Sequence, residues 1–191
     1  DLPAAYRGEE LIPNEYGMYD YALDEEKSLQ SEQYERAKKY YTEKFEGIDF
    51  VSLAGNTENH MGMMVRKSAF ISQQTVDEWC KQQGTQSNLL FMAAFSLVLS
   101  KLTRQSDVAY YSINHGRMDK RLRNAYGMFV KSVPILAKVS GQQKVMDFIK
   151  TFRTELMSSI RYNAYPFNHF CRDLHQEPRI SFGFQGVAMQ E

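Results

Sequence analysis

Apolar residues recur every three or four positions in several stretches of the chain, which is the spacing of a helix with one buried face. The pattern predicts helices over 31–46, 72–84, 87–103 and 142–161, and a short helical segment over 166–174. The stretch over 87–103 is apolar almost all round, so we expect that helix to be buried against a sheet.

Capping residues place several helix ends. Ser31 and Ser72 are suited to begin two of the predicted helices, and Thr85 or Ser87 to begin the helix over 87–103. Gly84 is suited to end the helix that precedes it, because glycine readily adopts the left-handed conformation of a helix terminus.

Short apolar runs between the helices predict strands of a sheet. Because helices and strands alternate along the chain, we predict an α/β fold with a mixed sheet and packed helices. The predicted strands are Ile48–Leu53, Met61–Phe70, Val108–Ile113, Val133–Val139 and Arg179–Phe184.

The first 30 residues are polar and rich in turn-forming residues, including Pro3, Gly8, Pro13 and Gly17. We predict an arm or loop over 1–30.

Composition limits the possible functions. The 191 residues include 23 Lys and Arg against 23 Asp and Glu, whereas a general nucleic-acid-binding domain carries a basic excess. No apolar run reaches the roughly 18 residues of a membrane span. The two cysteines, Cys80 and Cys171, favour a reducing compartment. We therefore predict a cytoplasmic protein that binds neither nucleic acid nor membrane, and the start at Asp1 suggests a piece of a longer protein.

Two of the four histidines precede an aspartate by four positions, as His115 precedes Asp119 and His169 precedes Asp173. Several acyltransferases use this spacing, with the histidine as general base and the aspartate as its support. Their signature continues with glycine, which neither pair has. His169 lies among phenylalanines and is interpreted as a packing residue. His115 lies where a strand becomes a loop, so it is the candidate for chemistry.

Other motifs are few. The cysteines and histidines do not have metal-ligand spacing, so we predict no metal site. The basic run over 119–123 is interpreted as a solvated loop, or as a docking patch for an acidic partner or a phosphate. Gly116-Arg117 and Gly127-x-Phe129 stand beside strand ends, where a positive φ or a close backbone approach is often needed.

Taken in order, these segments resemble the condensation domain of nonribosomal peptide synthetases. The family has a helix like that over 91–103, a strand, a Gly-Arg pair, and a Gly-x-Phe-Val segment ten residues after the arginine. Arg117 and Gly127 have that separation in this chain. The segments 165–167, 179–185 and 19–22 resemble further motifs of the family.

The chain departs from the family pattern in a few places. The family's His-His-x-x-x-Asp-Gly motif is absent, and we expect it upstream of Asp1. Lys131 stands where the family usually has asparagine, Leu136 where it often has arginine, and Met18 where it has tyrosine.

The resemblance implies a chloramphenicol acetyltransferase-like fold of two α/β lobes with a tunnel between them. Residues 31–191 would form the C-terminal lobe and residues 1–30 the connection to the N-terminal lobe. The complete domain would join an acyl or peptidyl thioester to an aminoacyl amine, both held by carrier proteins on phosphopantetheine arms, beside an adenylation domain. No cofactor would bind this chain directly. The catalytic histidine would lie upstream, so no catalytic residue is assigned here.

The residues that the resemblance selects have supporting roles, either lining the tunnel or fixing a loop. Tyr19 is a further candidate for anchoring the link between lobes. The assigned residues are Arg117, Gly127, Phe129, Val130, Lys131, Asp20 and Tyr21.

Three alternatives stay open. The chain could come from an epimerising or cyclising relative, or from a non-catalytic module that docks carrier proteins. It could also be a free-standing acyltransferase that uses His115. Whether the chain alone is an enzyme is not decided by its sequence.

Overall fold

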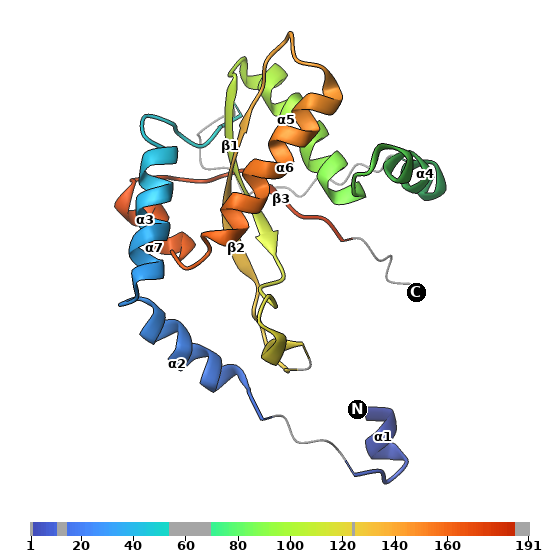
Figure 1. The fold of residues 1–191 in the computed structure, drawn as a ribbon, viewed down its shortest axis with the longest axis vertical. Helices are drawn as coiled ribbons and strands as arrows, with labels where there is room; N and C mark the ends of the chain where they lie inside the picture. The colour runs from blue at the N-terminus through green and yellow to red at the C-terminus, as the bar shows by residue number, and fades with distance from the viewer. Residues whose placement is uncertain (1, 11–14, 54–69, 124, 186–191) are drawn as a thin grey trace, which may run out of the picture.

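The protein consists of helices on both sides of a small sheet (Figure 1). The structure is a computed structural model and describes residues 2–10, 15–53, 70–123 and 125–185. In chain order, the elements are α1 (Leu2–Tyr6), α2 (Met18–Ser28), α3 (Glu32–Lys44), α4 (Gln73–Gln83), α5 (Ser87–Thr103), β1 (Asp107–Asn114), the 3₁₀ turn η1 (Lys120–Leu122), β2 (Lys131–Lys138), α6 (Val145–Arg161), α7 (Phe167–Asp173) and β3 (Ser181–Phe182).

The sheet is mixed, with the strand order β2-β1-β3. β1 and β2 pair antiparallel along their whole length, from Asp107 opposite Lys138 to Asn114 opposite Lys131. β3 pairs parallel with β1 through Ser181 and Phe182 only.

Both central strands are buried on both faces, because successive side chains point to opposite sides of a strand. In β1, Val108 and Tyr110 belong to one hydrophobic core, and Ala109 belongs to the other. In β2, Ile135 and Leu136 divide in the same way. This arrangement explains why both strands appear in the sequence as continuous apolar runs.

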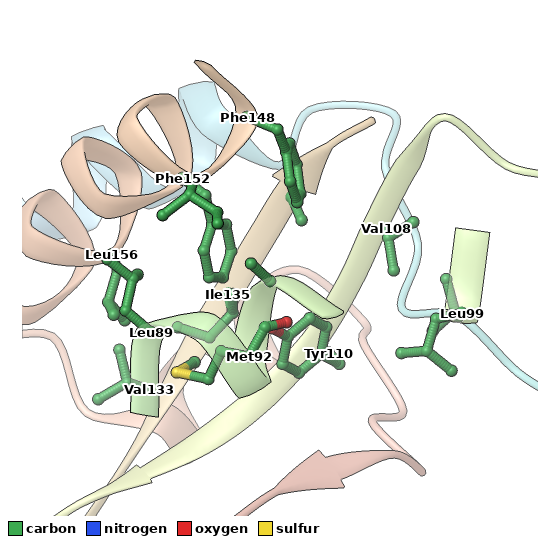
Figure 2. Close-up of a cluster of buried hydrophobic side chains, with 14 residues drawn as sticks. Leu89, Met92, Leu99, Val108, Tyr110, Val133, Ile135, Phe148, Phe152 and Leu156 are labelled. Carbon is green, nitrogen blue, oxygen red and sulfur yellow. The ribbon is translucent and has the colours of Figure 1, made fainter. Parts of the chain in front are cut away.

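The larger core lies between the sheet and helices α5 and α6 (Figure 2). Phe148 and Phe152 of α6 and Leu89 and Met92 of α5 are among its buried side chains. The hydroxyl of Tyr110 is also buried there and lies 2.9 Å from the hydroxyl of Ser96, so a polar group inside the core has its partner.

The second core lies on the opposite face and is mainly aromatic. Phe170 of α7 is fully buried and contacts the rings of Tyr41, Phe45 and Phe50. In Figure 1, α3 and α7 lie together on the side of the strands away from α5 and α6.

Polar contacts join α7 to α3 at the edge of this core. Tyr165 donates a hydrogen bond of 2.9 Å to Asp173, which also contacts Arg172 and pairs with Lys38 of α3 at 3.3 Å. The Tyr165 hydrogen bond, followed by the contacts with Arg172 and Lys38, holds the pKa of Asp173 at about 2. The carboxylate is therefore charged wherever the protein is folded near neutral pH.

Most predicted helices and the two central strands are confirmed. Ser31 caps α3 through a hydrogen bond from Tyr34 N–H, and Ser72 caps α4 in the same way. Gly84 ends α4 in the left-handed conformation with φ 62°. The mixed sheet with packed helices is also confirmed.

Residues 1–30 are not a loop for much of their length, whereas their role as an arm that connects to another lobe stays a prediction. Leu2–Tyr6 and Met18–Ser28 are helices. Gly17 marks a helix start rather than a turn, because the Asp20 carboxylate accepts its backbone N–H at 3.0 Å.

Other details of the sequence prediction differ. The N-cap of α5 is Gln86, not Thr85 or Ser87, and Val98 and Leu102 are more than half exposed, so α5 buries one face only. The segment around Phe50 makes a single bridge to Ala109 instead of a strand. The last strand is only Ser181–Phe182, and the predicted strand over 61–70 falls almost entirely outside the described residues.

Candidate functional site

The loop that joins β1 to β2, over residues 115–130, carries most of the residues that the sequence analysis selected. We call it the β1–β2 loop. It leaves the end of the two-stranded ladder and lies against α2, which comes from the N-terminal part of the chain (Figure 1).

Arg117 holds the β1–β2 loop in its shape. Its guanidinium donates hydrogen bonds to the carbonyl oxygens of Leu122, Ala125 (2.7 Å) and Gly127 (3.2 Å). The same guanidinium lies 4.6 Å from the centre of the Phe129 ring. One side chain therefore satisfies backbone acceptors that the irregular loop leaves unpaired.

Gly116 lets the two ends of the loop approach each other. Its φ is 69°, and a Cβ at this position would lie 1.6 Å from the carbonyl oxygen of Phe129. Only glycine fits there, because the approaching atom belongs to the backbone.

Replacement of Arg117 by lysine is expected to destabilise the protein by about 2 kcal/mol, because an ammonium group cannot reach three carbonyls in a fixed plane. Arg123, which is exposed in the same loop, is the matched control, and Arg123→Lys is expected to change the free energy of unfolding by less than about 0.5 kcal/mol. Urea unfolding followed by circular dichroism measures both. Equal effects of the two substitutions would contradict the role of Arg117.

Helix α2 packs on the loop through an aromatic contact. Tyr21 meets Phe129 edge to face, with the ring centres 5.1 Å apart. Leu122, Ala125 and Phe129 are buried together beneath Tyr16 and Tyr21. The loop therefore has a small core of its own.

Gly127 lies at the same contact, with a φ of 143° and the Met18 side chain in the space that a Cβ would take. Asp20 caps α2, as described above, whereas Tyr19 is 77% exposed and Val130 is 53% exposed.

Lys131 faces α2 rather than open solvent. Its ammonium pairs with Glu25 at 2.8 Å and lies 5.6 Å from the centre of the Tyr21 ring. Burial by itself lowers the pKa of Lys131, but the contacts with Glu25 and Tyr21 outweigh it, and the pKa is raised. Lys131 therefore stays charged and bound to α2.

A second ion pair joins the same two segments. Arg121 pairs with Asp24 of α2 at 3.2 Å and with Asp119 of its own loop. The hydroxyl of Tyr16 donates to Asp24 at 2.8 Å, and the Arg121 guanidinium lies over the Tyr16 ring. Burial, followed by the hydrogen bond to Asp24, raises the pKa of Tyr16 to about 12.

A cleft of about 510 Å³ lies between α2, the start of β2 and the segment before α7. The resemblance had selected two of its lining residues, Val130 and Lys131, and the motif over 165–167. The contributions of α2 and Asn163 were missed, because those residues show no local pattern. The polar residues that line it include Glu25, Lys131, Ser132, Asn163, Tyr165 and Asn168.

Neither histidine–aspartate spacing forms a pair in the structure. Asp119 binds Arg121, while His115 is exposed and its Nδ1 accepts the backbone N–H of Arg117 at 2.9 Å. His169 is half-buried, and its Nδ1 lies 3.1 Å from the hydroxyl of Tyr34. The structure therefore brings together the selected residues of α2 and the loop, but leaves His115 outside that cluster.

Within the described ranges, no group of His, Cys, Asp or Glu side chains is arranged to hold a metal ion. Nor does any helix in those ranges have the length and apolar character required to cross a bilayer. Cys80 and Cys171 are both free thiols, and burial raises the pKa of each.

The fold is shared with solved condensation domains. The first condensation domain of the calcium-dependent antibiotic synthetase, in complex with substrate analogue 3a, is 19% identical in sequence and superposes with a TM-score of 0.77 over 94% of this chain and 41% of that one. The X-domain from teicoplanin biosynthesis superposes with a TM-score of 0.68 at 16% identity, over 91% of this chain and 42% of that one. The protein therefore has the chloramphenicol acetyltransferase-like α/β fold.

The family model described as "Condensation domain" matches residues 1–188, and the chain belongs to that family. Among curated proteins, a plipastatin synthase from Bacillus subtilis (strain 168) is 26% identical over all of this chain, which spans 8% of that protein. Surfactin synthase subunit 1 of the same organism is 24% identical over 84% of this chain and 5% of its own length. The resemblance to the condensation domain and the predicted fold class are both confirmed.

Proposed function

We propose that this chain is the C-terminal lobe of a condensation domain in a nonribosomal peptide synthetase. With an N-terminal lobe, it forms an amide bond between an acyl or peptidyl thioester and an aminoacyl amine. Both substrates are carried on phosphopantetheine arms by carrier proteins of a cytoplasmic synthetase that also contains an adenylation domain.

The observation that carries this proposal is the extent of the match. The family model runs through residues 1–188, yet the chain covers 41% of the solved condensation domain from the calcium-dependent antibiotic synthetase. The His-His-x-x-x-Asp-Gly motif is not in the sequence. Both facts fit a C-terminal lobe that shapes the site while the catalytic histidine lies on the N-terminal lobe.

The exposed apolar side chains of the β1–β2 loop support the proposal that another protein unit packs on this chain. Met118, Met128 and Val130 are each more than half exposed, although the base of the same loop is tightly held by Arg117. Exposed apolar side chains that are grouped on an ordered segment are typical of a surface that another protein unit covers.

In this arrangement the chain's own residues position the reactants. Arg117 and Gly116 fix the β1–β2 loop, and the ion pairs of Lys131 and Arg121 fix α2 against it. Carrier tethering then supplies a high effective concentration, so that holding the two substrates in place contributes much of the rate.

Reconstitution tests the proposal. The 191-residue chain is co-expressed with the part of its own protein that precedes it, and amide formation is measured with substrates loaded on carrier proteins. We expect activity only when both parts are present, and loss of activity when the second histidine of an upstream His-His-x-x-x-Asp-Gly motif is replaced by alanine. Amide formation by the 191-residue chain alone would overturn the proposal.

The alternative function is that of a non-catalytic module that docks carrier proteins, in which the upstream segment would lack the motif as well. That candidate predicts that the reconstituted pair binds a loaded carrier protein but forms no amide product. The same assay therefore separates the two functions.

A further inference from the structure

A second hollow, of about 210 Å³, opens where β1 ends, on the side of the sheet that α5 and α6 cover. Its floor is apolar and well packed. Figure 2 shows the floor residues Met92, Val133, Ile135 and Leu156 at one end of the larger core, away from Leu99 and Val108. Ile113, Ile160, Phe182 and Phe184 complete its apolar lining.

The two phenylalanines on this lining are held by rings of α5. Phe182 lies against Phe95, with ring centres 5.3 Å apart, and Phe184 stacks on Phe91 at 5.8 Å. The lining is therefore built from the side chains of two helices and of all three strands or their ends, and is not a gap beside a single loose segment.

Polar residues form the rim of the hollow, and two of them are already used by the fold. Ser112 donates to the carbonyl of Phe182 at 2.9 Å, and the Asn114 side chain accepts the backbone N–H of Gly116 at 2.8 Å. The other two rim residues are Asn88 and His115, whose carboxamide and imidazole groups can form hydrogen bonds with a ligand.

The tautomer of His115 follows from its backbone contact. Nδ1 accepts the N–H of Arg117, so the proton of the neutral ring is on Nε2, which becomes a hydrogen-bond donor. The carboxamide of Asn88 makes no hydrogen bond within the part of the chain that the structure describes. The rim therefore offers donors for a carbonyl oxygen beside an apolar floor.

We propose that this hollow binds the apolar side chain or acyl chain of a substrate, with the adjacent carbonyl group held at the rim by His115 and Asn88. The inference rests on the proposed function, because the carbonyl is that of a thioester or an aminoacyl group. It adds the substrate class: a carbon chain or small ring that is mainly apolar.

The size of the hollow agrees with one such group. An apolar cavity of roughly 150 Å³ can hold benzene, whereas pockets for whole drug-sized ligands measure roughly 300–1,000 Å³. A single side chain or a short acyl chain therefore fits, and the rest of a substrate would lie outside.

Titration of the 191-residue protein with two kinds of probe tests the proposal. The donor-type probes are N-acetylcysteamine thioesters of acetate, butyrate and hexanoate, and the acceptor-type probes are the amides of glycine, valine and leucine. Binding is followed through the methyl resonances of Met92, Val133 and Leu156. Within a series we expect each added methylene to strengthen binding by about fourfold until the hollow is full.

Substitutions of residues that line the hollow test whether the probes bind there. We expect Leu156→Phe to fill the hollow and weaken binding by about tenfold or more, and Phe184→Ala to weaken it by about fivefold. His115→Ala should weaken the binding of every probe by a similar factor, because all carry a carbonyl. Val98→Ala, on the exposed side of α5, is the matched control and should leave binding unchanged.

The outcomes separate the sources of the ligand. Binding of thioesters alone assigns the hollow to the acyl donor, and binding of amino acid amides alone assigns it to the acceptor; either result supports the proposal. No methyl shifts at millimolar probe, or binding that Leu156→Phe and Phe184→Ala do not weaken, would overturn it. Probe binding requires no amide formation, so a failed reconstitution would count against the proposed function without affecting this result.

Discussion

Replacement of Gly116 by alanine is expected to destabilise the protein by about 3 kcal/mol or more. Two effects add. Alanine at a φ of 69° is strained, and its Cβ would meet the carbonyl oxygen of Phe129 at 1.6 Å. The backbone of the β1–β2 loop would have to move, and its movement would release the carbonyls that Arg117 binds.

Gly84 provides a control in which only the strain operates. Its φ is 62°, but a Cβ there would meet nothing within 4 Å. Gly84→Ala should therefore cost only about 1 kcal/mol. Urea unfolding measures both free energies, and a loss for Gly84→Ala as large as that for Gly116→Ala would show that the contact with Phe129 is not the cause.

Phe170→Ala is expected to be the most damaging single truncation in the aromatic core, with a loss of about 4 kcal/mol in the free energy of unfolding. The side chain is fully buried and contacts rings of α3, α7 and the segment around Phe50. Its removal leaves a cavity among large, rigid rings that cannot collapse to fill the space.

The matched control is Phe70→Ala, because Phe70 is 98% exposed. That substitution should change the free energy of unfolding by less than about 0.5 kcal/mol. Urea unfolding of the unchanged protein and of both variants provides the comparison. It is valid when the free energy of unfolding falls with urea concentration at the same slope in all three. A loss below about 1 kcal/mol for Phe170→Ala would contradict the packing described for this face of the sheet.

Local sequence patterns were sufficient to predict most of the helices and the two central strands. The spacing of apolar residues over 31–46 predicted α3, and its residues Tyr34, Ala37 and Tyr41 are buried. The apolar runs of β1 and β2 were also recognised. In contrast, α2 was missed because its few apolar positions lie in a polar segment, and the helix is held by contacts with a loop about 100 residues later.

The candidate site was predictable in part. The resemblance to the condensation domain selected Arg117, Gly127, Phe129, Lys131 and Tyr21, and the structure brings these residues together. It did not reveal their partners. Glu25, Asp24 and Tyr16 carry no motif, and their roles depend on where α2 lies.

The amino-acid order by itself determined most of the helices, the central strands and membership of the condensation family, because side-chain periodicity and motif spacing are properties of neighbouring positions. Only the tertiary structure decided that Arg117 binds three loop carbonyls, that Lys131 faces Glu25, and that His115 stands at the rim of an apolar hollow. These contacts depend on backbone paths and on residues far apart in the chain, and no local pattern encodes their distances.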